Sequence, residues 1–280
     1  MAEKPRRPRW RRWLERGTVV AVMTYLLVLV MLILFENSLV FPALRAEQGW
    51  MEPGELAPQD VSLALPDGTP IHGWWCPHKG ASGALLYCHG NGGNISLRSL
   101  TYRNLQKEQN VSVLAIDYPG YGRSGGKPDE AGCCAAAEAG FAWLTSVAKV
   151  PAERIILFGE SLGSGVAVEL ATRHPCRALV LMCAFTSLPD AAHGLYPFLP
   201  CRWLMRNRFE NSAKLPGVHR PVFLYHGDAD DLISPAHAMR LREVANEPVE
   251  LYSEQGGTHE LEPSPGLHAA LRAFLQKHAP

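Results

Sequence analysis

Short apolar runs alternate with longer stretches of helical composition along most of this 280-residue sequence, and this alternation restricts the fold more than any other feature. Short apolar runs bounded by turn signals are typical of buried strands. Strand–helix alternation of this kind favours an α/β fold with a mostly parallel central sheet and helices on both faces. The expected strands are residues 84–88, 111–116, 154–158, 178–182, 222–225 and 249–252, and the expected helices are residues 96–109, 130–148, 163–174, 235–246 and 265–278.

The first part of the folded region predicts an antiparallel hairpin. Residues 61–65 alternate in polarity, and residues 66–69 have the composition of a turn. Residues 71–75 are expected to form the second strand, antiparallel to the first. The chain is long enough for one full-sized domain with an appendage, and we expect that domain to occupy residues 61–280.

One interval breaks the strand–helix rhythm, between the strands at 178–182 and 222–225. It is rich in proline and aromatic residues. A structureless loop of that length is unusual in a compact domain, so we expect a small helical cap at about residues 185–217. The alternative is an ordinary surface crossover.

The N-terminal region predicts a membrane anchor. Residues 17–35 carry no formal charge, and a helix of these 19 residues is about 28 Å long, close to the thickness of a bilayer core. Seven basic side chains in residues 1–16 form a tail that the positive-inside rule keeps in the cytoplasm. The expected order is a basic tail (1–16), a transmembrane anchor (17–36) and a linker (37–60), with the folded domain on the extracytoplasmic side.

Two alternatives to an uncleaved anchor are a buried core helix and a cleaved signal peptide. Core helices seldom run this far without a charge, and signal peptides usually have a shorter apolar region followed by a small-residue cleavage site. The formal net charge of zero gives no indication of a nucleic-acid partner. Seven cysteines neither support nor exclude export, and without a CxxC or Cys/His ligand spacing we expect no metal site.

The pattern Gly-Glu-Ser-Leu-Gly at 159–163 places Ser161 between the strand predicted at 154–158 and a predicted helix. A G-x-S-x-G pattern alone is common, but in a strand–turn–helix context it is the nucleophile elbow. The glycines keep the neighbourhood of Ser161 small enough for strand and helix to pack closely. The alternative is a tight structural turn without chemistry.

A serine nucleophile needs a base and an acid, which in this kind of fold follow it along the chain in the order acid, histidine. Asp228, Asp230 and Asp231 follow the strand at 222–225, and we favour Asp230, with the other two as turn-forming or solvated carboxylates. His259 lies in a glycine-rich loop ahead of the last helix, which suits a general base.

Acyl transfer also needs N–H donors for an oxyanion. The loop His-Gly-Asn-Gly-Gly-Asn at 89–94 follows a predicted strand, and the backbone N–H groups of Asn91 and Leu162 are the expected pair. A phosphate-binding loop is the competing interpretation, but neither of the usual glycine-rich phosphate motifs is present. His89 is expected to be a structural hydrogen-bonding residue.

Four segments together resemble one known family. They are residues 89–94, the run Asp-Tyr-Pro-Gly-Tyr-Gly-Arg-Ser at 117–124, residues 159–163, and His-Gly-Asp-Ala-Asp at 226–230. The sequence is similar in these segments to the membrane-anchored Bem46-like α/β-hydrolases, over residues 37–262 and the preceding apolar segment.

This resemblance implies an α/β-hydrolase fold and esterase or thioesterase chemistry. It implies that the acid is the fifth residue of the His-Gly motif, which is Asp230, and that the histidine of a Gly-x-x-His-type loop is His259. One departure is Glu260, where relatives often carry asparagine.

The sequence therefore predicts a serine hydrolase that cleaves an ester or thioester through an acyl-enzyme. His259 would take the proton of Ser161, Asp230 would orient His259, and the Asn91 and Leu162 N–H groups would hold the oxyanion. The mechanism requires no cofactor, and the expected substrate is a small-molecule or lipid-like acyl compound. The alternatives are a serine peptidase and a non-catalytic, membrane-tethered binding module with the same fold.

Overall fold

The computed structural model describes residues 9–259 and 264–280. Part of the basic tail and Glu260 lie outside these residues. Within the described residues, eight strands form one sheet in the order β1-β2-β4-β3-β5-β6-β7-β8. Their bounds are Gln59–Ala64 (β1), Pro70–Cys76 (β2), Ala84–Cys88 (β3), Ser112–Ile116 (β4), Ile155–Glu160 (β5), Ala178–Met182 (β6), Val222–Gly227 (β7) and Val249–Glu254 (β8).

The expected hairpin and parallel sheet are both confirmed. Strand β1 pairs antiparallel with β2, and β2 pairs antiparallel with β4, whereas all pairings from β4 to β8 are parallel. The four strands β3 to β6 are apolar almost throughout because helices cover both faces of the sheet.

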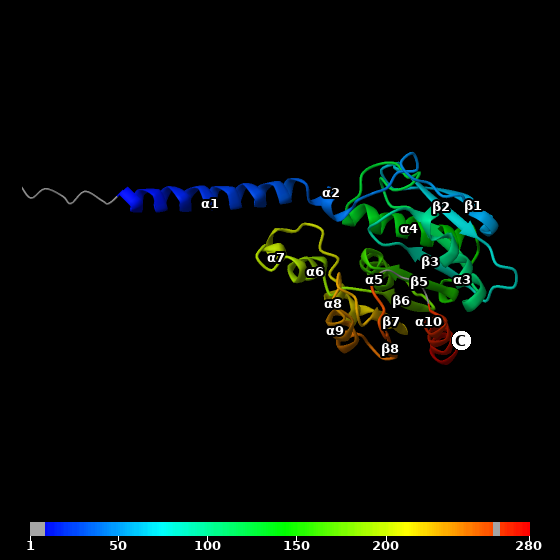
Figure 1. Ribbon diagram of the computed structural model, residues 1–280. Coiled ribbons are helices and arrows are strands. Elements are labelled where there is room, and N and C mark those ends of the chain that lie inside the picture. The colour runs from blue at the N-terminus through cyan, green and yellow to red at the C-terminus, as the bar shows by residue number, and fades with distance from the viewer. Residues whose placement is uncertain (1–8, 260–263) are drawn as a thin grey trace, which may run out of the picture.

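Helices pack on both faces of this sheet (Figure 1). On one face lie α4 (Glu130–Ser146), α5 (Leu162–Arg173) and α9 (Ala236–Val244). On the other lie α3 (Ser99–Gln109) and α10 (Pro265–His278). Short 3-10 turns occur at Gly54–Leu56 (η1), Ile95–Arg98 (η2), Ala152–Arg154 (η3) and Leu215–Gly217 (η4).

The N-terminal helix α1 (Arg9–Leu34) extends away from the domain as a long straight rod (Figure 1). Its segment Trp10–Leu34 is long and apolar enough to cross a membrane, with a mean hydropathy of 2.6, and none of its most apolar part is buried in the protein. A core helix would be mostly buried, so this exposure argues against the buried-helix alternative.

The segment expected to be a linker (37–60) differs from that expectation in its first part. Helix α2 (Glu36–Val40) follows α1 directly. Phe41 is buried and meets Phe209 edge-on, with ring centroids 6.4 Å apart. Isolated bridges then pair Ala43 with Gly93 and Arg45 with Gly122. The chain after the apolar helix is therefore packed on the domain from its first turn, because its apolar side chains find partners there.

The 185–217 segment between β6 and β7 contains three short helices, α6 (Leu188–Leu195), α7 (Cys201–Leu204) and α8 (Asn211–Lys214). Ser187 caps α6 by accepting a hydrogen bond from the Asp190 N–H. Figure 1 shows α6 and α7 beside the C-terminal part of α1.

Candidate active site

Ser161 occupies the sharp turn between β5 and α5. Its backbone has φ +50°, a left-handed conformation that non-glycine residues adopt rarely and that is often found at functional sites. A side chain at Gly163 would overlap the carbonyl of Cys88, and one at Gly159 would overlap the start of α5. Glycine at both positions therefore allows the helix to pack against the strands with Ser161 held at the turn.

The structure brings Ser161, His259 and Asp230 together. His259 Nε2 lies 3.0 Å from Ser161 Oγ, and His259 Nδ1 lies 2.8 Å from Asp230 Oδ2. Ser161 follows β5, Asp230 follows β7 and His259 follows β8. These strands are parallel, so the three side chains meet at one edge of the sheet.

The environment of Asp230 keeps its carboxyl group ionised. Burial alone would raise its pKa, but hydrogen bonds from His226, from His259 and from the Ile233 N–H hold the pKa well below its ordinary value. The Leu232 N–H also donates to Oδ1, at 3.0 Å. Since an ionised carboxylate only accepts, Nδ1 of His259 carries the proton and donates to Asp230, and Nε2 is left to accept from the hydroxyl of Ser161.

The other two carboxylates of this loop are exposed to solvent. Asp228 is exposed and accepts a hydrogen bond from the Gly256 N–H at 2.6 Å, and Asp231 is exposed as well. Only Asp230 among the three is buried, with 5% of its surface accessible. The structure thus distinguishes three carboxylates that the sequence separates poorly.

The loop at 89–94 lies next to the turn that carries Ser161. Asn91, Ser161 and Leu162 line the same cavity. An oxyanion site formed by the N–H groups of Asn91 and Leu162 requires this arrangement. The loop is held in place by the Tyr121 hydroxyl, which donates to the Asn91 carbonyl at 2.8 Å. Asn91 Nδ2 in turn donates to the carbonyl of Val40 in α2, at 3.4 Å.

His89 has no access to the cavity side of this loop, because it is fully buried against the ring of Tyr118. Burial and the nearby charge of Arg98 lower its pKa to about 4. Its Nδ1 lies 2.7 Å from the carbonyl of Gly90 and therefore donates to it. The residue is a neutral hydrogen-bonding element of the loop.

A partly buried ion pair, which sequence reasoning missed, connects the loop to the serine turn. Arg98 donates two hydrogen bonds to Glu160, the residue before Ser161, at 2.8 and 3.0 Å. The same guanidinium donates to the carbonyls of Gly92 and Asn94 in the loop. Burial alone would raise the pKa of Glu160, but the charge and hydrogen bonds of Arg98 keep it below its ordinary value. The pair therefore fixes the loop relative to Ser161.

A cavity of about 500 Å³ opens beside Ser161. That volume lies within the usual range for small-molecule sites. Its walls are mainly apolar and come from α1, α2, the 185–217 segment and the loop after β7. The lining side chains are Leu32, Glu36, Leu39, Val40, Asn91, Ser161, Leu162, Phe185, Leu188, Ala191, Ala192, Leu195, Tyr196, Leu199, Cys201, Met205, Leu232 and Ile233.

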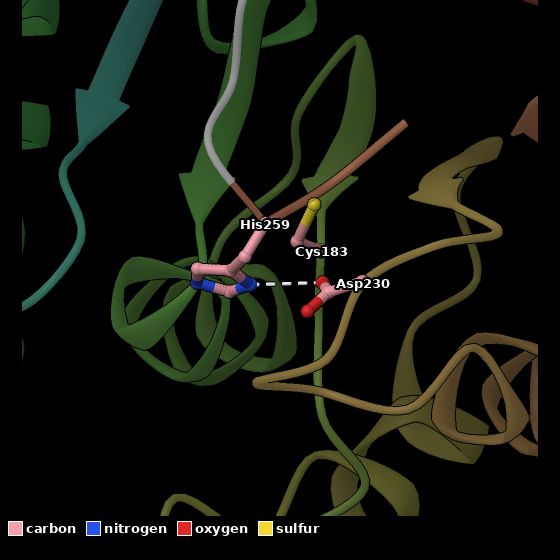
Figure 2. Close-up of side chains that lie close together, drawn as sticks. All are labelled: Cys183, Asp230 and His259. Carbon is pink, nitrogen blue, oxygen red and sulfur yellow. Dashed lines mark hydrogen bonds and ion pairs between the residues drawn. The ribbon is translucent and has the colours of Figure 1, made fainter. Parts of the chain in front are cut away.

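Cys183 lies beside Asp230 and His259, and Figure 2 shows the three side chains converging. Their donor atoms all lie within 4.8 Å of one another, which raises the question of a metal. Burial and the charge of Asp230 raise the pKa of the Cys183 thiol to about 12. Both ring nitrogens of His259 already have partners in Asp230 and Ser161. The cluster fits a hydrogen-bonded chain better than a metal site.

Comparison with known proteins places the chain in a family. Residues 83–200 match the family model described as the alpha/beta hydrolase fold. An uncharacterized protein of Mycobacterium tuberculosis is 39% identical over 228 residues, which cover 80% of this chain and 81% of that protein. Alpha/beta hydrolase domain-containing protein 17B of Homo sapiens is 32% identical over 184 residues, which cover 64% of this chain and 61% of that protein.

Among solved structures, the Pyrococcus furiosus esterase Pf2001 is similar to this chain with a TM-score of 0.69 and 23% identity. The match covers 86% of this chain and 97% of the esterase, and at that identity it shows the fold. With the sheet, the family match and the relatives in agreement, the chain belongs to the alpha/beta hydrolase family.

Proposed function

We propose that this protein is a membrane-anchored serine hydrolase that cleaves an ester or thioester of a small-molecule or lipid-like acyl compound. The observation that carries the proposal is the hydrogen-bonded chain from Ser161 through His259 to Asp230, situated next to a large apolar cavity. A nucleophile, a base within hydrogen-bonding distance and an ionised group that orients the base are what acyl transfer requires.

In the first step, His259 Nε2 takes the proton of Ser161 while Oγ attacks the carbonyl carbon of the substrate. The backbone N–H groups of Asn91 and Leu162 hold the negative oxygen of the tetrahedral intermediate. When that intermediate collapses, the bond to the leaving oxygen or sulfur breaks, and His259 gives its proton to the departing alcohol or thiol. The acyl group remains on Ser161.

In the second step, a water molecule gives a proton to His259 and attacks the acyl-enzyme. The bond to Oγ breaks, the proton returns to Ser161, and a carboxylic acid leaves. Asp230 stays ionised throughout and stabilises the imidazolium form of His259 in both steps. Neither a cofactor nor a metal enters this sequence.

The proposal extends to the position of the protein in the cell. Helix α1 spans a membrane with the basic N-terminal tail in the cytoplasm and the hydrolase domain on the other side. The 185–217 segment acts as a cap over the site, and the chain is a member of the Bem46-like subfamily. The length, apolar character and exposure of α1 support the anchor, and the basic residues that precede it support the orientation.

The test is a series of p-nitrophenyl esters and matching thioesters of increasing acyl-chain length, given to the full-length protein in detergent. We expect hydrolysis by the wild type and, because the nucleophile is lost, a fall of at least about 10³-fold in Ser161→Ala. Equal activity of the two proteins would exclude Ser161 as the nucleophile. Preference for p-nitroanilides would favour a peptidase, and inactivity toward every substrate would favour a binding module.

A further inference from the structure

The tip of the 185–217 segment, residues 195–204, lies alongside the apolar helix α1. The hydroxyl of Tyr25, in the middle of α1, donates to the carbonyl of Phe198 at 2.9 Å. Closer to the end of α1, side chains of Leu29, Leu32 and Ile33 face the tip across a small apolar hollow. The tip therefore follows α1 from its end back to Tyr25.

A buried carboxylate holds this arrangement in place. Glu36 Oε1 accepts hydrogen bonds from the Arg206 and Asn207 N–H groups and from the Asn207 side-chain amide, at 2.8–2.9 Å. Arg206 also donates to Glu36 Oε2 at 3.0 Å and to the carbonyl of Ile33 at 2.9 Å. The end of α1 and the segment that carries the tip are thus one connected unit.

The depth of the tip follows from the rise of a helix. Tyr25 lies nine residues before Leu34, where α1 ends, and at 1.5 Å per residue this corresponds to about 14 Å. The hydrocarbon core of a bilayer is about 30 Å thick, so a tip that reaches Tyr25 enters the leaflet in which α1 ends.

The surface of the tip has the chemistry of a bilayer contact. Tyr196, Phe198 and Trp203 are 50%, 69% and 88% exposed, a concentration of aromatic side chains that is costly in water but typical of the membrane interface. The exposed cation of this region, Arg202, is paired with Asp190 at 2.6 Å. A long arginine side chain can direct its charge toward the headgroups while its stem stays in the apolar layer.

The cavity beside Ser161 connects to this surface. Its lining includes Leu32 and Leu39, from the end of α1 and from α2, together with Leu195 and Tyr196 of the tip. A single apolar space therefore extends from the nucleophile to the junction between the anchor helix and the tip. An acyl chain could enter it from the leaflet without crossing water.

We propose that residues 195–204 are embedded in the leaflet beside α1, and that the substrate is a membrane-resident lipid ester whose acyl chain enters the cavity between them. The part of this inference that concerns the lipid substrate rests on the proposed hydrolase function. The embedding of residues 195–204 is independent of catalysis, so the embedding and the substrate class can be tested separately.

The embedding is tested by fluorescence of the full-length protein in phosphatidylcholine vesicles that contain lipids brominated on their acyl chains, which quench nearby tryptophans. We compare wild type with Trp203→Phe. The emission that this substitution removes is strongly quenched if the tip lies among acyl chains. The matched control is Trp143→Phe, a half-buried tryptophan of the domain that packs against Trp75, whose emission is expected to be unquenched. Equal, weak quenching of both tryptophans would overturn the embedding.

The substrate class is tested with two substrates, a long-chain lipid ester dissolved in vesicles and p-nitrophenyl acetate in solution. Phe198→Asp places a charge in the leaflet at a residue that does not itself line the cavity, and it keeps the Tyr25 hydrogen bond, which uses the backbone of Phe198. We expect its activity on the vesicle substrate to fall by at least about tenfold, because a charge at this depth opposes insertion. Activity on p-nitrophenyl acetate is expected to stay unchanged.

The control for this measurement is Leu100→Asp, which adds the same charge at a residue of α3 that is 60% exposed. Equal vesicle activity of Phe198→Asp and Leu100→Asp would overturn the lipid inference, and so would a wild type that cleaves only soluble esters. In both cases hydrolysis of p-nitrophenyl acetate by wild type, and its loss in Ser161→Ala, would leave the proposed hydrolase function standing. Persistence of that hydrolysis in Ser161→Ala would instead contradict the proposed function.

Discussion

Two carboxylates in one loop have opposite environments, and the difference decides which of them can act on a histidine. Asp228 is exposed and stabilises a turn, whereas Asp230 is buried and receives hydrogen bonds from two backbone N–H groups. His226 Nε2 lies 2.7 Å from the carbonyl of Ile233 and 3.1 Å from Asp230, so it carries the proton and directs it toward both acceptors. These contacts orient Asp230 before any substrate binds.

Replacement of Asp230 by asparagine is expected to lower kcat by about 10³- to 10⁴-fold. The neutral amide can present an N–H to His259 Nδ1, which favours the tautomer that cannot accept the proton of Ser161. Steady-state hydrolysis of p-nitrophenyl esters measures the change. The matched control, Asp228→Asn, is expected to stay within about twofold of wild type, since it alters an exposed turn. A similar loss in both variants would contradict the assignment of the acid.

The low pKa of Asp230 also predicts how stability depends on pH. Because the folded pKa is depressed, ionised Asp230 stabilises the protein fully above its unfolded-state pKa of about 3.9, and this contribution is lost as the pH falls below that value. Urea unfolding from about pH 6 to about pH 3 is expected to show that wild type loses more free energy of unfolding than Asp230→Asn. Parallel curves for the two proteins would be inconsistent with a depressed pKa.

At the scale of elements, the site depends on how closely α5 approaches the ends of β3 and β5. Gly163 in the first turn of α5 has the carbonyl of Cys88 so near that a methyl group would overlap it. The small residues of the 159–163 pattern are thus a packing requirement of the strand–turn–helix unit that presents Ser161.

Gly163→Ala is therefore expected to destabilise the protein by about 1–3 kcal/mol or more, because strand and helix must separate to admit the methyl group. Thermal unfolding followed by circular dichroism measures the change. Gly194→Ala in α6 is the matched control, since no atom lies within 4 Å of the position that its methyl group would take. An unchanged midpoint in Gly163→Ala would show that the turn relaxes at little cost.

Local sequence patterns predict the strands and helices well, but they predict contacts between residues far apart in the sequence poorly. The strands and helices of the domain follow from hydrophobic periodicity, and Ser161 and His259 can be named because each sits in a short motif after a predicted strand. The position after a predicted strand favours Asp230 only weakly over Asp228 and Asp231, and the family resemblance strengthens that preference. The catalytic roles of Ser161, His259 and Asp230 stay predictions until they are measured.

Contacts between residues far apart in sequence leave no local signal, and these shape much of the site. Arg98 and Glu160 are 62 residues apart, and Glu36 and Asn207 are 171 residues apart. The sequence around Cys183 indicates only a small core residue at the end of a strand, and it does not indicate that Cys183 lies next to Asp230. For the same reason the start of the expected linker proved to be packed, since its partner Phe209 lies in a distant loop.

At the scale of the whole molecule, one helix outside the domain contributes to the cavity inside it. The end of α1 supplies Leu32 to the cavity wall, and Glu36 of α2 ties that wall to the 185–217 segment. Helix α1 and the site are consequently parts of one structure rather than two modules joined by a free connection.

The orientation proposed for α1 makes a further prediction. In that orientation the basic tail stays in the cytoplasm, so a C-terminal reporter enzyme that is active only outside the cytoplasm is expected to be active when fused to the full-length chain. A variant with the arginines of residues 6–16 replaced by glutamine provides the control and is expected to show a mixed orientation. Activity confined to a cytoplasmic reporter would contradict the extracytoplasmic domain.

The proposed mechanism depends most on Ser161 as an activated nucleophile, which covalent labelling can measure. Full-length protein is treated with a fluorophosphonate, and the adduct is located by mass spectrometry of its peptides. We expect one adduct on Ser161 in wild type, with labelling abolished in Ser161→Ala and greatly slowed in Asp230→Asn. An unlabelled wild type, or equal labelling of Ser161→Ala, would contradict the proposed mechanism.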